Sequence, residues 1–102
     1  MKRMLQHIGV RPECLKDYMA LHDHIWPELA AEIHAAHIQN YSIFYCNGQL
    51  TQYLEYTGDD LEGDMQRLSR SEVMQRWCSI CKPMQIPSSG QWSDAQEVFY
   101  LQ

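Results

Sequence analysis

Three side chains that could bind a small molecule and move a proton recur at helical spacing between residues 18 and 26. Tyr18, His22 and Trp26 are four residues apart, so in a helix they lie on one face, one turn above the other. Histidine exchanges a proton near neutral pH, and tyrosine and tryptophan each combine a flat apolar ring with one polar atom. This combination suits a sugar ligand. The alternative is a histidine that is simply buried and hydrogen-bonded in the core.

Two further aromatic residues could reach the same place from other elements. Tyr41 lies in a predicted strand and Trp77 in a predicted helix, and both could equally be ordinary core residues. The chain contains no Gly-x-Ser-x-Gly motif, phosphate-binding loop, dinucleotide fingerprint or His-Glu-x-x-His motif. Acid/base chemistry on a neutral small molecule is therefore the possibility that remains.

The cysteines permit one alternative chemistry. Cys78 and Cys81 have the spacing of a zinc-binding pair, and His34 and His37 could complete a tetrahedral site. The same three-residue spacing also arises wherever one face of a helix is buried. We therefore expect free thiols and no metal, and a small metal or redox protein stays as the alternative.

The elements that must position these residues follow from the hydrophobic periodicity. Alternation predicts strands, and apolar residues at every third or fourth position predict helices. Pro27 bends or divides the first helix, Asn47-Gly48 closes a hairpin, Asp59-Asp60 offers a helix cap, and Ser71 starts a new helical segment. The predicted strands are 2–10, 39–46, 49–57 and 97–101, the predicted helical regions are 12–33 and 61–80, and 82–94 is a loop.

This order predicts an α+β protein with a ferredoxin-like βαββαβ domain, in which an antiparallel sheet carries both helical regions on one face. Aromatic side chains recur on both sides of the predicted strands. The sheet face away from the helices therefore needs a cover, and a second copy packed sheet against sheet would provide it. We expect a homodimer.

Composition limits the classes of function. The 102 residues are 45% apolar, and 8 basic against 13 acidic side chains give a formal charge of −5. This size predicts a single domain spanning 1–102, and the acidic balance with scattered basic residues argues against nucleic acid as a partner. No apolar run approaches the about 20 residues of a membrane-spanning helix, and none resembles a signal peptide. We expect a cytoplasmic protein without a membrane partner.

Four blocks of the sequence together resemble the L-rhamnose mutarotase family. They are Tyr18-x-x-x-His22-x-x-Ile25-Trp26-Pro27-Glu28-Leu29, Asn40-Tyr41-Ser42-Ile43, Gln75-Arg76-Trp77 and Glu97-Val98-Phe99-Tyr100-Leu101. They occur in order and span almost the whole chain. The resemblance implies a dimeric α+β barrel and an isomerase that interconverts the α and β anomers of a 6-deoxy-hexose. L-rhamnose is the expected sugar and L-fucose the alternative.

The resemblance also implies roles for single residues. His22 matches the proposed acid/base residue, Tyr18 and Tyr41 match sugar-binding tyrosines, and Trp77 with Cys78 matches a sugar-binding Trp-Trp pair. Cys78 departs from that pair and removes a large apolar wall from the expected site, which leaves the choice of sugar open. No metal or cofactor is implied. A dimeric α+β barrel protein that binds a small ligand without catalysis is the non-enzymatic alternative.

Overall fold

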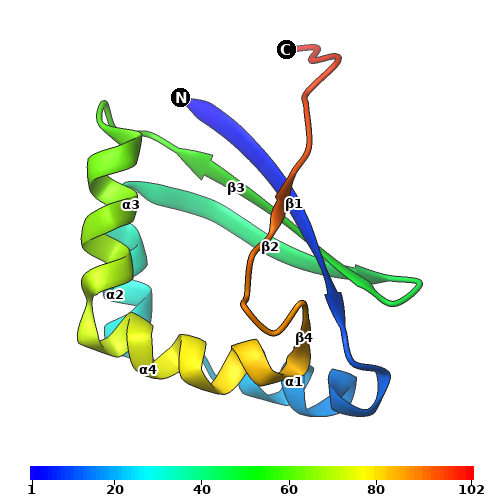
Figure 1. Cartoon of the computed structure of the whole chain (residues 1–102). Helices are drawn as coiled ribbons and strands as arrows, with labels where there is room; N and C mark the ends of the chain where they lie inside the picture. Colours follow the sequence, from blue (N-terminus) through cyan, green and yellow to red (C-terminus); the bar gives the residue numbers. More distant parts are fainter.

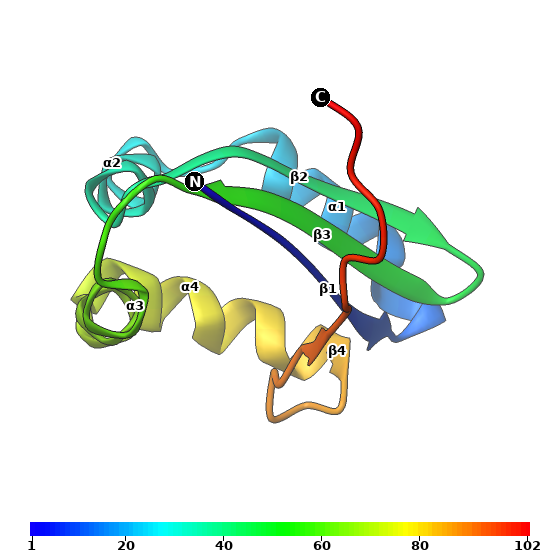
Figure 2. The ribbon, with the colours of Figure 1, turned by 90° about the horizontal axis from the view of Figure 1, so that it is seen from above.

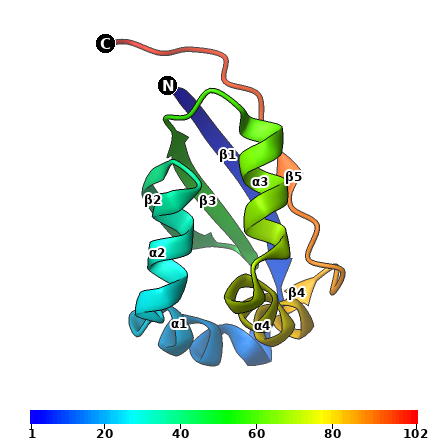
Figure 3. The same cartoon turned by 90° about the vertical axis from the view of Figure 1, so that its left-hand side faces the viewer.

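An antiparallel sheet forms one layer of the molecule, and four helices lie against one of its faces (Figure 1, Figure 3). The computed structural model describes all of residues 1–102. The strands pair in the order β2-β3-β1-β4, and β5 also pairs with β1. This is the order of a ferredoxin-like domain, so the predicted fold class is confirmed. The elements are β1 (Lys2–Val10), α1 (Leu15–Asp23), α2 (Pro27–Ala35), β2 (Ile38–Cys46), β3 (Gln49–Tyr56), α3 (Leu61–Arg70), α4 (Glu72–Cys81), β4 (Gln85–Ile86) and β5 (Ser93–Asp94).

Local sequence signals set the boundaries of the helices. Pro27 has no N–H to donate to a preceding turn, so the chain leaves α1 after Asp23 and re-enters a helix at Pro27. Asp60 and Ser71 cap α3 and α4, because their side chains accept hydrogen bonds at 3.1 and 3.3 Å from backbone N–H groups three residues further on. The predicted break at Pro27 and the predicted restart at Ser71 are both confirmed.

The hairpin between β2 and β3 forms as predicted and carries an irregularity that the sequence did not indicate. Asn47 (φ 50°) and Gly48 (φ 85°) both occupy the left-handed region that a two-residue turn of this kind requires. The register then shifts between Gln39 and Ser42, where β2 bulges against β3. Such a bulge redirects side chains, and Tyr41, which lies within it, points its hydroxyl toward the helix-covered face.

The main core lies where the sheet meets both pairs of helices. Seen from above, α1 and α2 lie along the β2 side of the sheet, and α3 and α4 lie along the β1 side (Figure 2). Alternate residues of β3 face the helices, and they are buried. Residues from both helix pairs meet residues of the sheet in one buried cluster of Ile8, Val10, Tyr18, Leu29, Leu50, Val73, Trp77 and Cys81. This packing fixes the helices that carry the candidate site residues.

The predicted last strand, Glu97–Leu101, is wrong. The edge of β1 is occupied instead by two short strands, β4 opposite Gly9 and Val10, and β5 opposite Gln6 and His7. Continuing the β5 register places Glu97 opposite Arg3, with which it forms an ion pair at 2.8 Å, and Val98 opposite Lys2, the first residue of β1. The residues after Val98 lie beyond the start of β1 and have no strand to pair with, and the segment runs past the N-terminus as an exposed tail (Figure 1).

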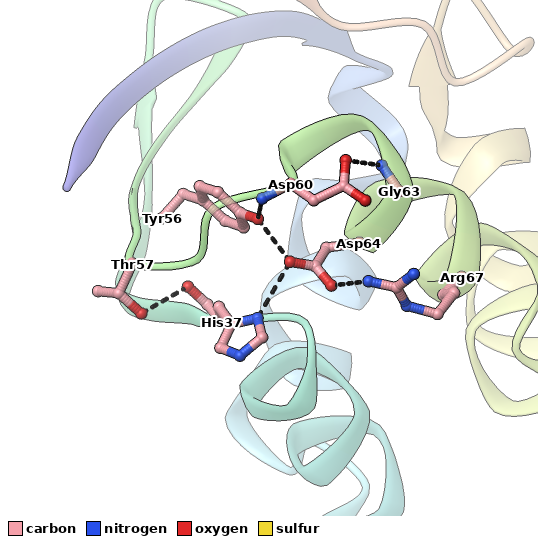
Figure 4. A network of polar contacts seen from close by, with 7 residues as sticks. All are labelled: His37, Tyr56, Thr57, Asp60, Gly63, Asp64 and Arg67. Carbon is pink, nitrogen blue, oxygen red and sulfur yellow. Dashed lines mark hydrogen bonds and ion pairs between the residues drawn. The ribbon is translucent and has the colours of Figure 1, made fainter.

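A polar network joins the end of α2, the end of β3 and the start of α3 (Figure 4). The Asp64 carboxylate is buried, with 3% of the residue exposed, and accepts hydrogen bonds from Tyr56 Oη at 2.5 Å and His37 Nδ1 at 3.0 Å. Arg67, one turn along α3, also donates to it. These hydrogen bonds, that of Tyr56 first, lower the pKa of Asp64 to about 2. One ionised carboxylate thus holds three elements together.

The sheet face away from the helices remains uncovered by the chain itself. Phe44 is paired with Thr51 and Leu5 with Tyr53, at positions that alternate with the buried residues of β3 and so face away from the helices. Phe44 is 63% exposed and Leu5 41% exposed.

No helix in the structure is long and apolar enough to cross a membrane.

Candidate functional site

A cleft of about 620 Å³ lies between the two helix pairs and the sheet. Most of its lining is apolar and comes from all four helices and the first three strands. A smaller set of side chains brings polar atoms to this lining: His22, His34, Tyr41, Gln6, Gln52 and Trp77. A mostly apolar cleft with a few polar groups is the usual form of a small-molecule site.

His22 lies at the polar part of this cleft on the last turn of α1. Its Nδ1 is 2.8 Å from the backbone carbonyl oxygen of Tyr18. A carbonyl oxygen can only accept, so Nδ1 carries the hydrogen and the neutral ring has its lone pair on Nε2. No protein group hydrogen-bonds to Nε2. Burial lowers the pKa of His22 from its ordinary value of 6.5, although the bond to the Tyr18 carbonyl opposes this shift. The imidazole is therefore held neutral, with one nitrogen free to accept a proton.

Aromatic rings hold His22 in this orientation. The Tyr18 ring stacks on the imidazole with centroids 4.4 Å apart, and Trp77 meets it edge-on at 5.1 Å. Trp26 in turn packs edge-on against Trp77, at 5.1 Å. The expectation that 18, 22 and 26 form one helical stripe facing the sheet holds for Tyr18, which belongs to the buried core with residues of β1 and β3. It is wrong for Trp26, which lies outside α1 in extended backbone just before α2 and packs on Trp77 of α4, because Pro27 ends the first helix early. The helix thus fixes the histidine by packing as well as by a hydrogen bond.

Tyr18 itself stands behind the cleft lining. It is buried, with 3% of its surface exposed, and its hydroxyl accepts a hydrogen bond at 3.1 Å from the buried amide of Gln85 in β4. Burial raises the pKa of Tyr18 to about 12, so the phenol stays protonated. In this position Tyr18 supports His22 through its ring and its carbonyl group. A direct contact between Tyr18 and a sugar stays a prediction.

Tyr41 enters the cleft from the opposite side, on β2. The residue is 39% exposed because β2 is an edge strand. Its hydroxyl, however, lies in the cleft and donates to the buried Gln52 Oε1 at 2.7 Å. Desolvation of this hydroxyl raises the pKa of Tyr41 above its ordinary range. The cleft therefore brings His22, Tyr41 and Trp77 together, as the sequence suggested they could be.

Cys78 does not belong to the lining of this cleft. Its half-buried thiol lies 3.6 Å from the sulfur of Met74, which does line the cleft. Burial raises the pKa of Cys78, and raises that of the buried Cys81 to about 12, so both are held as thiols. A contact between Cys78 and a sugar stays a prediction. The structure brings no three His, Cys, Asp or Glu side chains together as a metal site.

Three polar residues of the cleft lining, Gln6, Gln52 and His34, were not predicted from the sequence as site residues. Gln52 occupies an inward position of β3 between Leu50 and Leu54, and Gln6 lies opposite it on β1. The signal was present, because a glutamine at an inward position of an alternating strand must find a polar partner. His34 was considered only as a zinc ligand or a surface residue, and nothing in its spacing indicated the cleft.

The fold and the cleft define an α+β protein of the ferredoxin-like type, with a candidate small-molecule site lined by one neutral histidine that can exchange a proton. Comparisons with known proteins identify the family. The sequence model of the L-rhamnose mutarotase family matches residues 3–101. The chain belongs to the L-rhamnose mutarotase family.

Individual relatives agree with this assignment. The chain is 33% identical to the L-rhamnose mutarotase of Bacillus subtilis over 99% of both chains, and 35% identical to that of Pectobacterium carotovorum over 92% of both. A crystal structure of an L-rhamnose mutarotase from Formosa agariphila covers both chains completely, with a TM-score of 0.84 at 21% identity. An antibiotic biosynthesis monooxygenase shares the fold with a TM-score of 0.62, at 14% identity over 96% of this chain and 99% of that one.

Proposed function

We propose that this protein interconverts the α and β anomers of L-rhamnose by opening the sugar ring and closing it again. The observation that carries this proposal is the state of His22. Its Nδ1 is tied to a carbonyl group, so the neutral ring offers an unprotonated Nε2 at a cleft large enough for a monosaccharide. Membership of the L-rhamnose mutarotase family supports the same sugar and the same reaction.

Ring opening and ring closure each need two proton transfers. His22 Nε2 takes the proton of the anomeric hydroxyl while the bond between the anomeric carbon and the ring oxygen breaks, which leaves an aldehyde. The ring oxygen takes up a proton from a water molecule. The aldehyde group then rotates, so that its other face meets the hydroxyl group formed from the ring oxygen. The two proton transfers run in reverse, and the ring closes as the other anomer. Acid/base help of this kind accelerates a reaction by about 10² to 10⁴-fold.

The remaining lining suits the rest of the sugar. Trp77, of which 7% is exposed, offers an apolar surface beside His22, and Tyr41 offers a hydroxyl group from the other side. The apolar side chains of the cleft, among them Ile25 and Met74, fit a sugar that carries a methyl group in place of a hydroxymethyl group. We propose these contacts as the reason for a preference for 6-deoxy sugars.

Exchange NMR tests the proposed function directly. Magnetisation transfer between the H1 signals of the α and β anomers is measured with L-rhamnose and with L-fucose, with and without the protein. We expect faster exchange for L-rhamnose. Faster exchange for L-fucose would move the assignment to that sugar, and no acceleration for either would leave a protein that binds a small ligand without catalysis.

The rate should depend on pH through His22. The base must be neutral, and burial places the pKa of this histidine below its ordinary value of 6.5. We expect kcat/KM to fall on the acid side with a midpoint below about 6.5, since a lowered pKa keeps the ring neutral to lower pH. Exchange NMR between pH 4.5 and 8 checks this, and a midpoint above 7 would contradict it.

We propose that two copies associate through the uncovered sheet face. The support is the exposure of Phe44 (63%) and of the apolar tail residues Val98 (89%) and Phe99 (77%), which leaves a large apolar surface in water. Sedimentation velocity should give the mass of a homodimer, and Phe44→Lys should shift it toward the monomer. Met19→Lys is the matched control, because Met19 is also exposed (57%) but lies on α1. A monomeric wild-type protein would contradict the proposal.

We also propose that residues 1–102 act as one mutarotase domain and that the protein works in the cytoplasm. All four cysteines are free thiols, which is usual in a reducing compartment.

A further inference from the structure

A line of hydrogen bonds crosses the sheet from the cleft to the far edge, with one residue on each of β2, β3, β1 and β5. Tyr41 Oη on β2 donates to Gln52 Oε1 on β3 at 2.7 Å. Gln52 Nε2 donates to Gln6 Oε1 on β1 at 2.6 Å, and Gln6 Nε2 donates to Asp94 Oδ1 on β5 at 2.6 Å. Gln6 is the partner of Gln52 in the register of β1 with β3, and of Asp94 in that of β1 with β5. The strand pairing thus sets the four side chains in sequence.

The far end of this line determines the direction of every hydrogen bond in it. An ionised carboxylate can only accept, so Gln6 must turn its NH₂ group to Asp94 and its carbonyl group to Gln52. Gln52 must then donate its NH₂ group to Gln6 and present its carbonyl group to Tyr41. The Tyr41 hydroxyl has to donate its hydrogen to this carbonyl group. This result does not depend on how the two amides are assigned, because the carboxylate allows only one orientation of each.

We infer that Asp94, Gln6 and Gln52 are positioning residues that make Tyr41 a hydrogen-bond acceptor in the cleft. The inference rests on the proposed function, in which Tyr41 meets a hydroxyl group of the sugar. Because the Tyr41 hydroxyl donates its hydrogen to Gln52, its oxygen can only accept a hydrogen bond from the ligand. It therefore selects a sugar hydroxyl that donates, at one position of the ring.

Burial gives this arrangement its strength. Gln52 is 7% exposed, so water cannot readily replace a partner that it loses. Asp94, in contrast, is exposed on β5 and lies outside the cleft lining. A substitution at Asp94 can therefore change the polarity at Tyr41 without replacing any residue of the cleft lining.

Asp94→Lys is the substitution that reverses the line. An ammonium group can only donate, so Gln6 and Gln52 would both turn over, and Gln52 would donate its NH₂ group to the Tyr41 oxygen. The Tyr41 hydrogen would then point into the cleft. Asp94→Glu keeps an acceptor and is the conservative variant. Asp59→Lys makes the same change of charge at an exposed turn residue outside the line and is the matched control.

The direct readout is binding of L-rhamnose and of its 2-, 3- and 4-deoxyfluoro analogues, measured as Kd by NMR titration. Fluorine cannot donate a hydrogen bond. In the wild-type protein we expect one of the three analogues to bind about 10-fold more weakly than L-rhamnose. In Asp94→Lys this penalty should shrink to about 3-fold or less, because Tyr41 can now donate. Asp94→Glu and Asp59→Lys should keep the wild-type penalty, and Asp94→Lys should have no such effect in a Tyr41→Phe background.

A second readout separates this inference from the proposed function. Side-chain NH₂ signals of Gln6 and Gln52 in ¹⁵N spectra of the ligand-free protein should move in Asp94→Lys and stay in place in Asp59→Lys. Unchanged Gln52 signals, or equal fluorine penalties in Asp94→Lys and wild type, would overturn the inference. If wild-type protein does not accelerate anomer exchange, the proposed function fails, and the amide signals still decide whether Asp94 orients Gln52.

Discussion

His22→Ala is expected to lower the catalysed rate of anomer exchange by about 10² to 10⁴-fold, the usual contribution of a positioned acid/base group. The reason is that His22 is held neutral with its Nε2 free, and no other titratable group in the cleft is oriented in the same way. Exchange NMR with L-rhamnose measures the effect. Binding of the sugar should weaken much less than the rate falls, because the Trp77 surface and the Tyr41 hydroxyl remain.

His24→Ala is the matched control for this experiment. His24 lies two residues further on, is exposed, and does not line the cleft. We expect it to keep the wild-type rate within about 2-fold, as is usual for a surface substitution away from the site. Circular dichroism of both variants checks that the fold is retained. A His22→Ala protein that is folded and still exchanges anomers at the wild-type rate would remove His22 from the mechanism.

Most of the elements that position the site follow from local signals in the sequence. Pro27 divides the first helical region, Ser71 divides the second, and Asn47-Gly48 closes the hairpin, each through a conformational property of the residue itself. The four-residue spacing of Tyr18 and His22 likewise places His22 on the inner face of α1. Such features depend on a few neighbouring residues, and these can be read from one sequence.

The features that the sequence did not predict depend on pairing between distant segments. The last strand was expected at 97–101, but β1 offers its edge to Gln85–Ile86 and Ser93–Asp94 instead. At Gly9 a Cβ atom would lie 3.0 Å from the Ile86 carbonyl oxygen, so this close approach favours a glycine on β1. The reason is visible only when the two strands are side by side. Two other features also depend on strand pairing and were not predicted. They are the bulge in β2 at Tyr41, and the hydrogen bond between Gln52 and Gln6.

Asp64→Asn is expected to destabilise the fold by on the order of 5 to 10 °C in Tm, because the buried Asp64 carboxylate holds three elements together. The carboxylate of Asp64 accepts from Tyr56, His37 and Arg67 (Figure 4). An amide offers one acceptor oxygen and turns an NH₂ group toward the remaining donors, so at least one of them loses its partner. Thermal unfolding followed by circular dichroism at pH 7 measures the change, with Asp59→Asn as the control at an exposed position that makes no such bonds.

The pH dependence of this difference gives the prediction its second test. Hydrogen bonds, that of Tyr56 first, lower the pKa of Asp64 in the folded protein to about 2, below its ordinary value of 3.8. A group with a lowered pKa stabilises the fold fully above the unfolded value and loses that contribution as the pH falls through the folded value. The wild-type advantage over Asp64→Asn should therefore be constant above about pH 5 and shrink between about pH 4 and 2. An advantage that is already lost near pH 6 would contradict the assignment of this stabilisation to the ionised Asp64 carboxylate.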